Sequence, residues 1–304
     1  MKTNIKLCNM EMDNPTILAS GILGVTAASL KFCADNGAGA VTIKSITKEP
    51  RIGHPQPIVH FYEGGLMNAV GYSNPGFAEA LGEFEELGSV GAPVIGSIVA
   101  KDAEEFAFLA EYFADKLKFA ALEIPLSCPH TPGFGTMAGH SSPEATYEIT
   151  AAIKDATKLP VIIKLSPNVN NIGAVAKSAE EAGADAICAV NTLGPGMLID
   201  TDSKKRILGF GMGGLSGEAI KPIAIRTVYD IYKFVDIPII GTGGVASGDD
   251  AVQMMMAGAS AVGIGTAVLT RGANVFKLVT EEMKEYMEKN GYSKVSDLKG
   301  LAHE

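Results

Sequence analysis

Short apolar segments alternate with longer helix-like segments along almost the whole chain. The apolar runs are continuous, as in Val161-Ile162-Ile163, which is typical of parallel strands covered on both faces. Eight strand–helix alternations favour a closed parallel barrel, the (β/α)8 or TIM-barrel fold of the α/β class. The predicted strands are 15–19, 40–44, 94–99, 119–124, 161–165, 186–190, 238–241 and 261–265, and the clearest predicted helices are 104–116, 144–156, 172–182, 221–234, 249–257 and 275–289.

The connections between these segments differ in length at the two ends of the predicted barrel. Three helix-to-strand returns, 36–39, 182–185 and 257–259, are brief and contain Gly-Ala, a glycine-type helix stop. By contrast, the strand-to-helix connections 44–75, 126–143 and 191–221 are long insertions. Loops of this length are usually functional, and barrel enzymes hold their sites at the carboxyl ends of the strands. Decorative insertions or oligomer contacts are the alternative interpretation.

Composition excludes several classes of protein. The 304 residues, 47% of them hydrophobic, suit one barrel domain spanning residues 1–304. A net charge of −9 argues against a broad nucleic-acid or anionic-membrane surface, although one phosphate in a glycine-lined pocket is compatible with it. Residues 1–14 contain no apolar signal region, and no run reaches the roughly 18 apolar residues of a membrane span. The four dispersed cysteines indicate neither a disulfide framework nor a zinc site, so we expect a cytoplasmic protein.

Two glycine turns near the end of the chain indicate a phosphate site. Gly241-Thr242-Gly243-Gly244 follows the seventh strand and Gly263-Ile264-Gly265-Thr266 ends the eighth, where this fold usually holds phosphate. Glycine lets backbone N–H groups approach phosphate oxygens. Relief of crowding at barrel corners is the simpler alternative. The ligand is either a cofactor phosphate or a phosphorylated substrate.

Lys44 and Lys164 each lie near the end of an apolar strand. A lysine that points into a barrel is costly unless an anion pairs with it, although either residue instead points outward beneath a helix if the strand alternation is reversed. A lysine fixed inside would stabilise the negative edge of a reduced flavin.

Cys128 lies in Ser127-Cys128-Pro129-His130, just beyond the fourth strand. A thiol on a loop at the barrel mouth is a nucleophile, a base or a bystander, and the polar, proline-fixed loop favours a function. Cysteine is more often a small buried hydrophobic residue, which is our interpretation of Cys33 and Cys188. Amides and a hydroxyl on the same predicted face suit a planar ring of alternating C=O and N–H groups, although loop asparagine is also a common turn residue: Asn68, Asn74, Asn191 and Thr192.

Together these residues resemble class 1 dihydroorotate dehydrogenases over nearly the whole chain. Cysteine at the base position is similar to class 1, since the membrane-associated class has serine there, and Thr47-Lys48-Glu49-Pro50-Arg51 is similar to the 1B branch. The remaining shared phrases are Leu18-Ala19-Ser20-Gly21, Lys44-Ser45, Asn68-Ala69-Val70-Gly71, Ser127-Cys128-Pro129, Lys164-Leu165-Ser166-Pro167-Asn168, Asn191-Thr192, Gly213-Gly214-Leu215-Ser216-Gly217, Gly243-Gly244 and Gly265-Thr266.

The resemblance implies an FMN oxidoreductase acting on CH–CH bonds, in which Cys128 takes the C5 proton of dihydroorotate while hydride leaves C6 for flavin N5. It also implies a partner subunit with FAD and a 2Fe–2S cluster that passes electrons to NAD+, in a homodimer or heterotetramer. The implied FMN contacts are Ser20, Lys44, Ser45, Lys164, Val190, Gly217, Gly243, Gly244, Gly265 and Thr266. The implied orotate contacts are Lys44, Asn68, Ala69, Val70, Gly71, Tyr72, Asn191 and Thr192.

The chain departs from the family beside the expected base. Pro125 and His130 replace two asparagines of the family motif, and Ser97 stands where many relatives have asparagine. Because Pro125 removes a carboxamide that contacts flavin and substrate in the family, substrate choice can differ. The alternatives are therefore an FMN oxidoreductase for another dihydropyrimidine or an enone-like substrate and, more remotely, a catalytically silent flavin-binding subunit.

Overall fold

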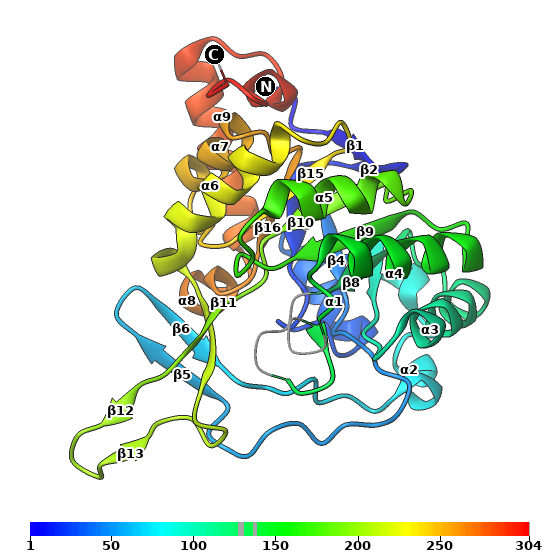
Figure 1. Cartoon of the computed structure of the whole chain (residues 1–304). Helices are drawn as coiled ribbons and strands as arrows, with labels where there is room; N and C mark the ends of the chain where they lie inside the picture. Colours follow the sequence, from blue (N-terminus) through cyan, green and yellow to red (C-terminus); the bar gives the residue numbers. More distant parts are fainter. Residues whose placement is uncertain (127–130, 136–138, 304) are drawn as a thin grey trace.

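The computed structural model describes residues 1–126, 131–135 and 139–303. A closed barrel of parallel strands forms its centre, and the last strand pairs back with the first. This arrangement confirms the predicted (β/α)8 fold (Figure 1). In order around the barrel, the strands are β3 (Thr16–Leu18), β4 (Ala40–Thr42), β7 (Val94–Ser97), β8 (Ala121–Pro125), β9 (Val161–Leu165), β10 (Ala186–Ala189), β15 (Ile239–Thr242) and β16 (Ala261–Ile264).

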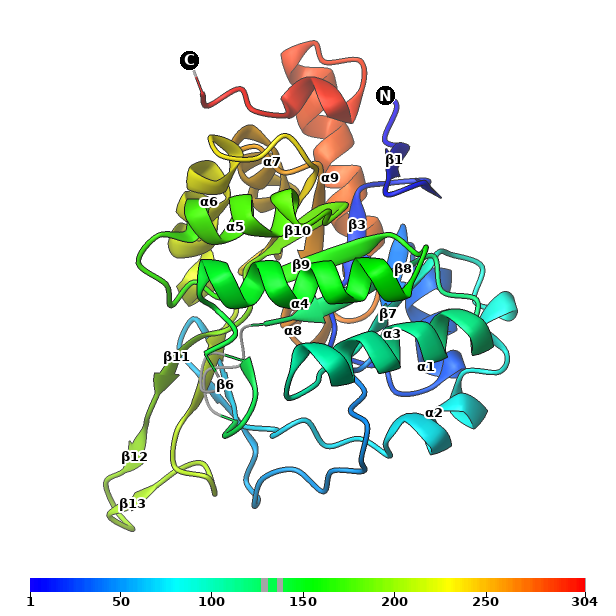
Figure 2. The same ribbon diagram turned by 45° about the vertical axis from the view of Figure 1, so that its right-hand side comes forward.

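Helices cover the outside of the barrel (Figure 2). Several begin at a polar cap: the side chains of Asp102, Ser142 and Asn171 each accept a hydrogen bond from a backbone N–H in the first turn, which satisfies a donor that has no partner within the helix. Within the described ranges, every helix lacks the length and hydrophobicity that a membrane crossing needs. The helices are α1 (Ala27–Asp35), α2 (Phe77–Glu83), α3 (Ala103–Lys116), α4 (Pro143–Ala156), α5 (Ile172–Glu181), α6 (Lys221–Tyr232), α7 (Gly248–Met256), α8 (Ala267–Arg271) and α9 (Val275–Asn290), with short 3-10 helices at Leu87–Ser89, Glu218–Ile220 and Val295–Leu298.

The part of the barrel interior nearest the amino-terminal ends of the strands is apolar and is covered by a hairpin. Ile95, Ile162 and Ile240 belong to a buried cluster inside the barrel, and the hairpin strands β1 (Ile5–Leu7) and β2 (Met10–Met12) add apolar side chains to the same cluster. The hairpin lies at the end of the barrel where the strands begin (Figure 1). The site must therefore lie at the opposite end.

Two of the long connections form strands that the sequence analysis treated as loops. β5 (Val59–Tyr62) and β6 (Gly65–Asn68) come from the connection after β4, and β11 (Leu193–Gly196) and β14 (Gly213–Ser216) from the one after β10. They join into one antiparallel sheet in the order β11-β14-β6-β5. Between β11 and β14, the hairpin β12 (Ile199–Asp200) and β13 (Lys205–Arg206) extends away from the barrel as an arm (Figure 1).

Candidate functional site

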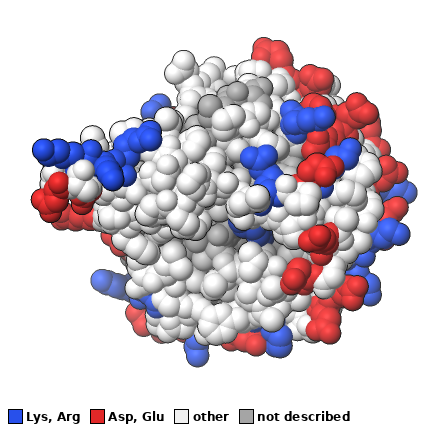
Figure 3. Space-filling model, turned by 90° about the horizontal axis from the view of Figure 1, so that it is seen from below, with Lys and Arg blue, Asp and Glu red and all other residues white. Residues whose placement is uncertain are grey.

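A cavity of about 530 Å³ lies at the carboxyl ends of the barrel strands, with residues of β5 and β6 on one side. Its volume falls in the range of roughly 300–1,000 Å³ that is typical of small-molecule sites. Figure 3 views this end of the molecule: the middle of the face is mainly uncharged, whereas charged side chains gather toward the edges and on the arm. Charged contacts with a ligand must therefore come mainly from the few charged residues that line the cavity itself, among them Lys44 and Lys164.

Most of the expected ligand-binding residues line this one cavity. Ala69 does not: it is fully buried in a cluster with Met67 and Leu208, so its side chain packs into the protein and not toward the cavity. Cys128 and its substituted neighbour His130 lie outside the described residues. The expected residues that line the cavity are Ser20, Lys44, Ser45, Asn68, Val70, Gly71, Tyr72, Lys164, Val190, Asn191, Thr192, Gly217, Gly243, Gly244, Gly265 and Thr266.

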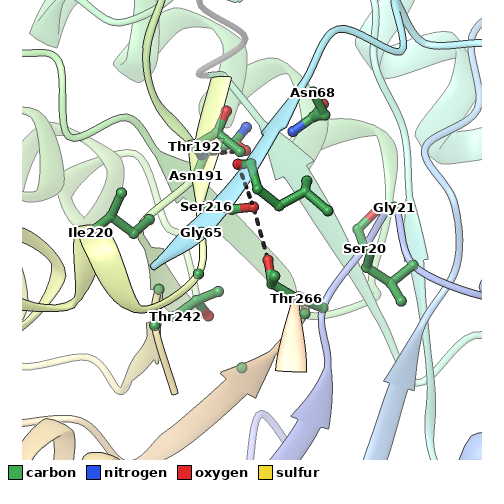
Figure 4. Close-up of a pocket in the computed structure, with 18 of the residues that line it drawn as sticks. Ser20, Gly21, Gly65, Asn68, Asn191, Thr192, Ser216, Ile220, Thr242 and Thr266 are labelled. Carbon is green, nitrogen blue, oxygen red and sulfur yellow. Dashed lines mark hydrogen bonds between the residues drawn. The ribbon is translucent and has the colours of Figure 1, made fainter. Parts of the chain in front are cut away.

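The two glycine turns meet at one end of the cavity. A Cβ on Gly244, whose φ is +78°, would lie 2.5 Å from Cβ of Lys221, so only glycine lets this turn pack against α6. In the described part of the chain, the backbone N–H groups of Gly243, Gly244 and Thr266 donate to no protein acceptor. The hydroxyl of Thr266 donates to Ser216 at 2.8 Å, and the two side chains point toward each other (Figure 4). Unpaired donors on close-packed glycine backbone fit a phosphate group.

The carboxylate of Asp250 fixes the turn after β15 from the side that faces away from the cavity. Asp250 accepts hydrogen bonds from the backbone N–H groups of Ala246 at 3.0 Å and Ser247 at 2.9 Å, and from Lys221 at 2.5 Å. Burial alone would raise the pKa of Asp250, but the hydrogen bond from Lys221, together with those from the turn, holds that pKa below its usual value. The turn is thus fixed by groups that do not face the cavity.

The floor of the cavity is polar. Lys164 on β9 donates a hydrogen bond to Glu123 on β8 at 3.2 Å, and the two residues are only 5% and 4% exposed. Burial would lower the pKa of Lys164, but the adjacent Glu123 carboxylate outweighs it and raises that pKa above its usual value. A lysine inside the barrel was expected to need an anionic partner, and for Lys164 that partner is Glu123.

A hydroxyl cluster adjoins this floor. Ser45 and Ser97 share a hydrogen bond of 2.9 Å, and Ser20 donates to the carbonyl oxygen of Ile43 at 2.7 Å while lying 3.3 Å from the Ser45 hydroxyl. Ser97 is fully buried and therefore acts from behind Ser20 and Ser45, which line the cavity.

Amide and hydroxyl groups from two separate loops meet at another wall. Asn68 at the end of β6 and Asn191 and Thr192 after β10 all border the cavity (Figure 4). They are brought together because β6 pairs with β14, with Asn68 opposite Gly214. Lys44 lies 5.9 Å from the centre of the Tyr72 ring on the same cavity. This wall can recognise a ring that carries C=O and N–H groups.

Asn74 has a different position from the other two loop amides, Asn68 and Asn191. It is buried, its side-chain oxygen accepts from the backbone N–H of Gly76 at 2.9 Å, and its amide donates to Thr47 at 2.9 Å. Asn74 therefore braces the loop after β4 and does not line the cavity.

Pro125 faces the cavity at the end of β8. In the parallel pairing of β8 with β9 it lies opposite Lys164. The proline ring presents apolar surface where a carboxamide would offer a donor and an acceptor. The substitution noted in the sequence therefore lies beside the buried lysine, in direct reach of a ligand.

Four cavity residues had no individual role predicted from the sequence, although Ser216 and Thr242 lie within quoted motifs: Glu123, Ser216, Ile220 and Thr242. Glu123 lay within a predicted strand, and its two-residue spacing from Pro125 places both on the same face. This spacing is the sequence signal that could have identified Glu123 as a cavity residue. The role of Ser216 could not be read from the motif that contains it, because its contact with Thr266 joins segments 50 residues apart.

Comparisons with known proteins agree with this geometry. Residues 2–287 match the family model described as "Dihydroorotate dehydrogenase". A protein of Methanocaldococcus jannaschii is 45% identical over 100% of this chain and 98% of its own length, and one of Pyrococcus furiosus is 46% identical over 99% of both. Both are named "Dihydroorotate dehydrogenase B (NAD(+)), catalytic subunit". The crystal structure of an Eimeria tenella DHODH in complex with ferulenol superposes with a TM-score of 0.85 at 22% identity, over 99% of this chain and 89% of that one, and this likeness supports the fold.

Proposed function

The chain belongs to the dihydroorotate dehydrogenase family, and on that basis we propose that it is the FMN-bearing catalytic subunit of a class 1B enzyme, oxidising dihydroorotate to orotate in pyrimidine biosynthesis. The observation that carries the proposal is one cavity that gathers the family's expected cofactor and substrate residues from both ends of the sequence, from Ser20 to Thr266. We treat residues 1–304 as one FMN-binding domain.

The residues present fit FMN. The glycine turns offer backbone donors without protein acceptors to the phosphate, with Gly217 and Gly265 beside them on the cavity wall. Lys164, Ser20 and Ser45 supply polar groups at the floor, where a flavin ring needs hydrogen-bond partners. Bound FMN supplies the hydride acceptor of the reaction.

The protein itself binds, orients and deprotonates the substrate. Asn68, Asn191, Thr192 and Lys44 hold the substrate ring and its carboxylate. Cys128, expected on the loop after β8, removes the proton from C5 as the hydride leaves C6, and so the C5–C6 bond becomes double.

Anaerobic mixing with substrate tests this function. Purified yellow protein is mixed with dihydroorotate or dihydrouracil, and bleaching of the flavin is followed by absorbance. We expect dihydroorotate to bleach the flavin and dihydrouracil to leave it oxidised. Bleaching by dihydrouracil alone would assign the paralogous activity that Pro125 allows. A yellow protein that neither substrate nor another organic reductant bleaches would indicate a catalytically silent flavin-binding subunit, and a protein that cannot be loaded with FMN would overturn the proposed function.

Electrons leave this chain through a partner. The relatives' name includes both NAD(+) and "catalytic subunit", which supports a second subunit. From the resemblance, that subunit carries FAD and a 2Fe–2S cluster and completes a heterotetramer around a homodimer of this chain, in the cytoplasm. Copurification of tagged chain with a second subunit, with NAD+ reduction by dihydroorotate as the readout, tests the assignment.

A further inference from the structure

The barrel interior changes character from the amino-terminal to the carboxyl-terminal ends of its strands. Near the amino-terminal ends, Ala121 and Ile162 belong to the apolar cluster that packs against the hairpin. Two residues further along each strand, Glu123 and Lys164 face the same interior and line the cavity floor. Barrel interiors are usually filled by branched apolar side chains, so a buried ion pair at the boundary between the apolar interior and the cavity requires an explanation.

We propose that Glu123 is a positioning residue for the reaction: its carboxylate, 3.2 Å from Lys164, keeps that ammonium charged and fixed at the cavity floor and so sets the reduction potential of the bound flavin. The proposal rests on the proposed function, because it requires FMN above this floor. It assigns to Glu123 an effect that operates through Lys164.

The pair cannot be explained by stability alone. A buried ion pair is commonly no more stable than apolar residues of similar volume, because both charges lose their hydration. Contact with water does not restore this hydration, because the side chains of Lys164 and Glu123 are only 7% and 6% accessible. Without Glu123, burial would drive the Lys164 ammonium toward the neutral amine.

The groups that face Lys164 from its neighbouring strands are few in the described chain. Glu123 comes from β8, Pro125 opposite it has no charge, and Cys188 lies opposite it on β10. Burial raises the pKa of Cys188 to about 12, so this thiol is neutral at ordinary pH. Lys44 lines the same cavity. Because Lys44 is present in wild type and in every variant below, its effect on the flavin potential cancels when they are compared.

Glu123 has two opposing effects on a flavin, and pH separates them. The carboxylate keeps Lys164 positive, which favours the negative charge of a reduced flavin. Its own negative charge disfavours that state. In Glu123→Gln, a charged Lys164 lacks its counter-ion at low pH, so the flavin should be easier to reduce than in wild type. At high pH the buried amine is neutral, and the flavin should be harder to reduce.

The midpoint potential of bound FMN is measured against reference dyes from about pH 6 to about pH 10, a range that brackets titration of a lysine shifted downward by burial. Relative to wild type, Glu123→Gln should give a more positive potential at the low end and a more negative one at the high end. Glu123→Asp, which keeps the carboxylate, should show no such reversal. Asp185→Asn, which breaks the Lys154–Asp185 pair outside the cavity, should follow wild type throughout.

A second readout does not depend on flavin. In protein labelled with ¹³C at lysine Cε, the Lys164 resonance is assigned by its loss in Lys164→Met. Its pKa should lie above the usual 10.5 in wild type and fall below it in Glu123→Gln. The proposal is overturned if the flavin potential of Glu123→Gln runs parallel to that of wild type at every pH, or if the Lys164 titration is the same in both proteins. A wild-type chain that binds no FMN instead overturns the proposed function, and the lysine titration still reports on the pair.

Discussion

Gly265 offers a direct test of where the ligand lies, because the protein itself has room for a side chain there. A Cβ added at this position would meet Cβ of Ala19 at 3.6 Å and Ile22 at 4.0 Å, which are ordinary van der Waals distances. Both neighbours line the cavity, so the added methyl enters the space reserved for ligand. Gly265→Ala should therefore weaken FMN binding without damaging the fold.

The expected magnitude follows from packing. Forcing an extra methyl into a close-packed site costs about 1–3 kcal/mol, and each 1.4 kcal/mol is roughly tenfold in affinity. FMN should therefore bind about 5- to 150-fold more weakly. The apoprotein should be unchanged or stabilised by up to about 1 kcal/mol, because alanine restricts the unfolded chain.

Flavin fluorescence quenching gives the Kd, and urea unfolding of flavin-free protein gives the free energy of unfolding. The matched control is Gly82→Ala in α2, where a Cβ would meet nothing within 4 Å and lies away from the cavity residues. It should gain about 0.5–1 kcal/mol and bind FMN normally. Wild-type affinity in Gly265→Ala would refute the reasoning, since the methyl would then not enter the ligand's space.

Two further predictions concern the thiols. Cys128→Ser should slow single-turnover flavin reduction by dihydroorotate by about 10²–10⁴-fold while the protein stays yellow; an unchanged rate would assign the base elsewhere. Burial raises the pKa values of Cys8, Cys33 and Cys188 to about 12, 11 and 12. These three thiols are therefore almost entirely protonated below pH 9, and iodoacetamide at neutral pH should label Cys128 in preference to them, as read by peptide mass spectrometry. Labelling of Cys8 or Cys188 at the rate of Cys128 would contradict that order.

The barrel was predictable from sequence because its signals are local. The barrel strands are short segments in which apolar residues predominate, and the ends of the helices given in the sequence analysis fall within two residues of the predicted ones, as for Lys221–Tyr232 against 221–234. The strand Val161–Leu165 was predicted with both its ends. Caps such as Asp102 and Ser142 mark where helices begin, and they can be read without any knowledge of the fold.

The antiparallel sheet of β5, β6, β11 and β14 beside the cavity was not predictable in the same way. β6 and β14 pair across about 150 residues of sequence, with Leu66 opposite Ser216, and strand formation there depends on the partner more than on the segment itself. The same reason hid Glu123 as the partner of Lys164. Lysine burial indicated that an anion was needed, but the barrel register was required to identify it.

The sheet formed by β5, β6, β11 and β14 has a consequence for how this protein can diversify. Barrel enzymes commonly acquire new specificities by changing one loop at a time on a constant scaffold. Here the loops after β4 and β10 are hydrogen-bonded to each other through β6 and β14, and Asn68 and Thr192 are carried on the two halves. A change in the length of one loop therefore has to be accommodated by the strand pairing that holds the other. A single substitution at a strand end, such as Pro125, changes the cavity wall without altering this pairing.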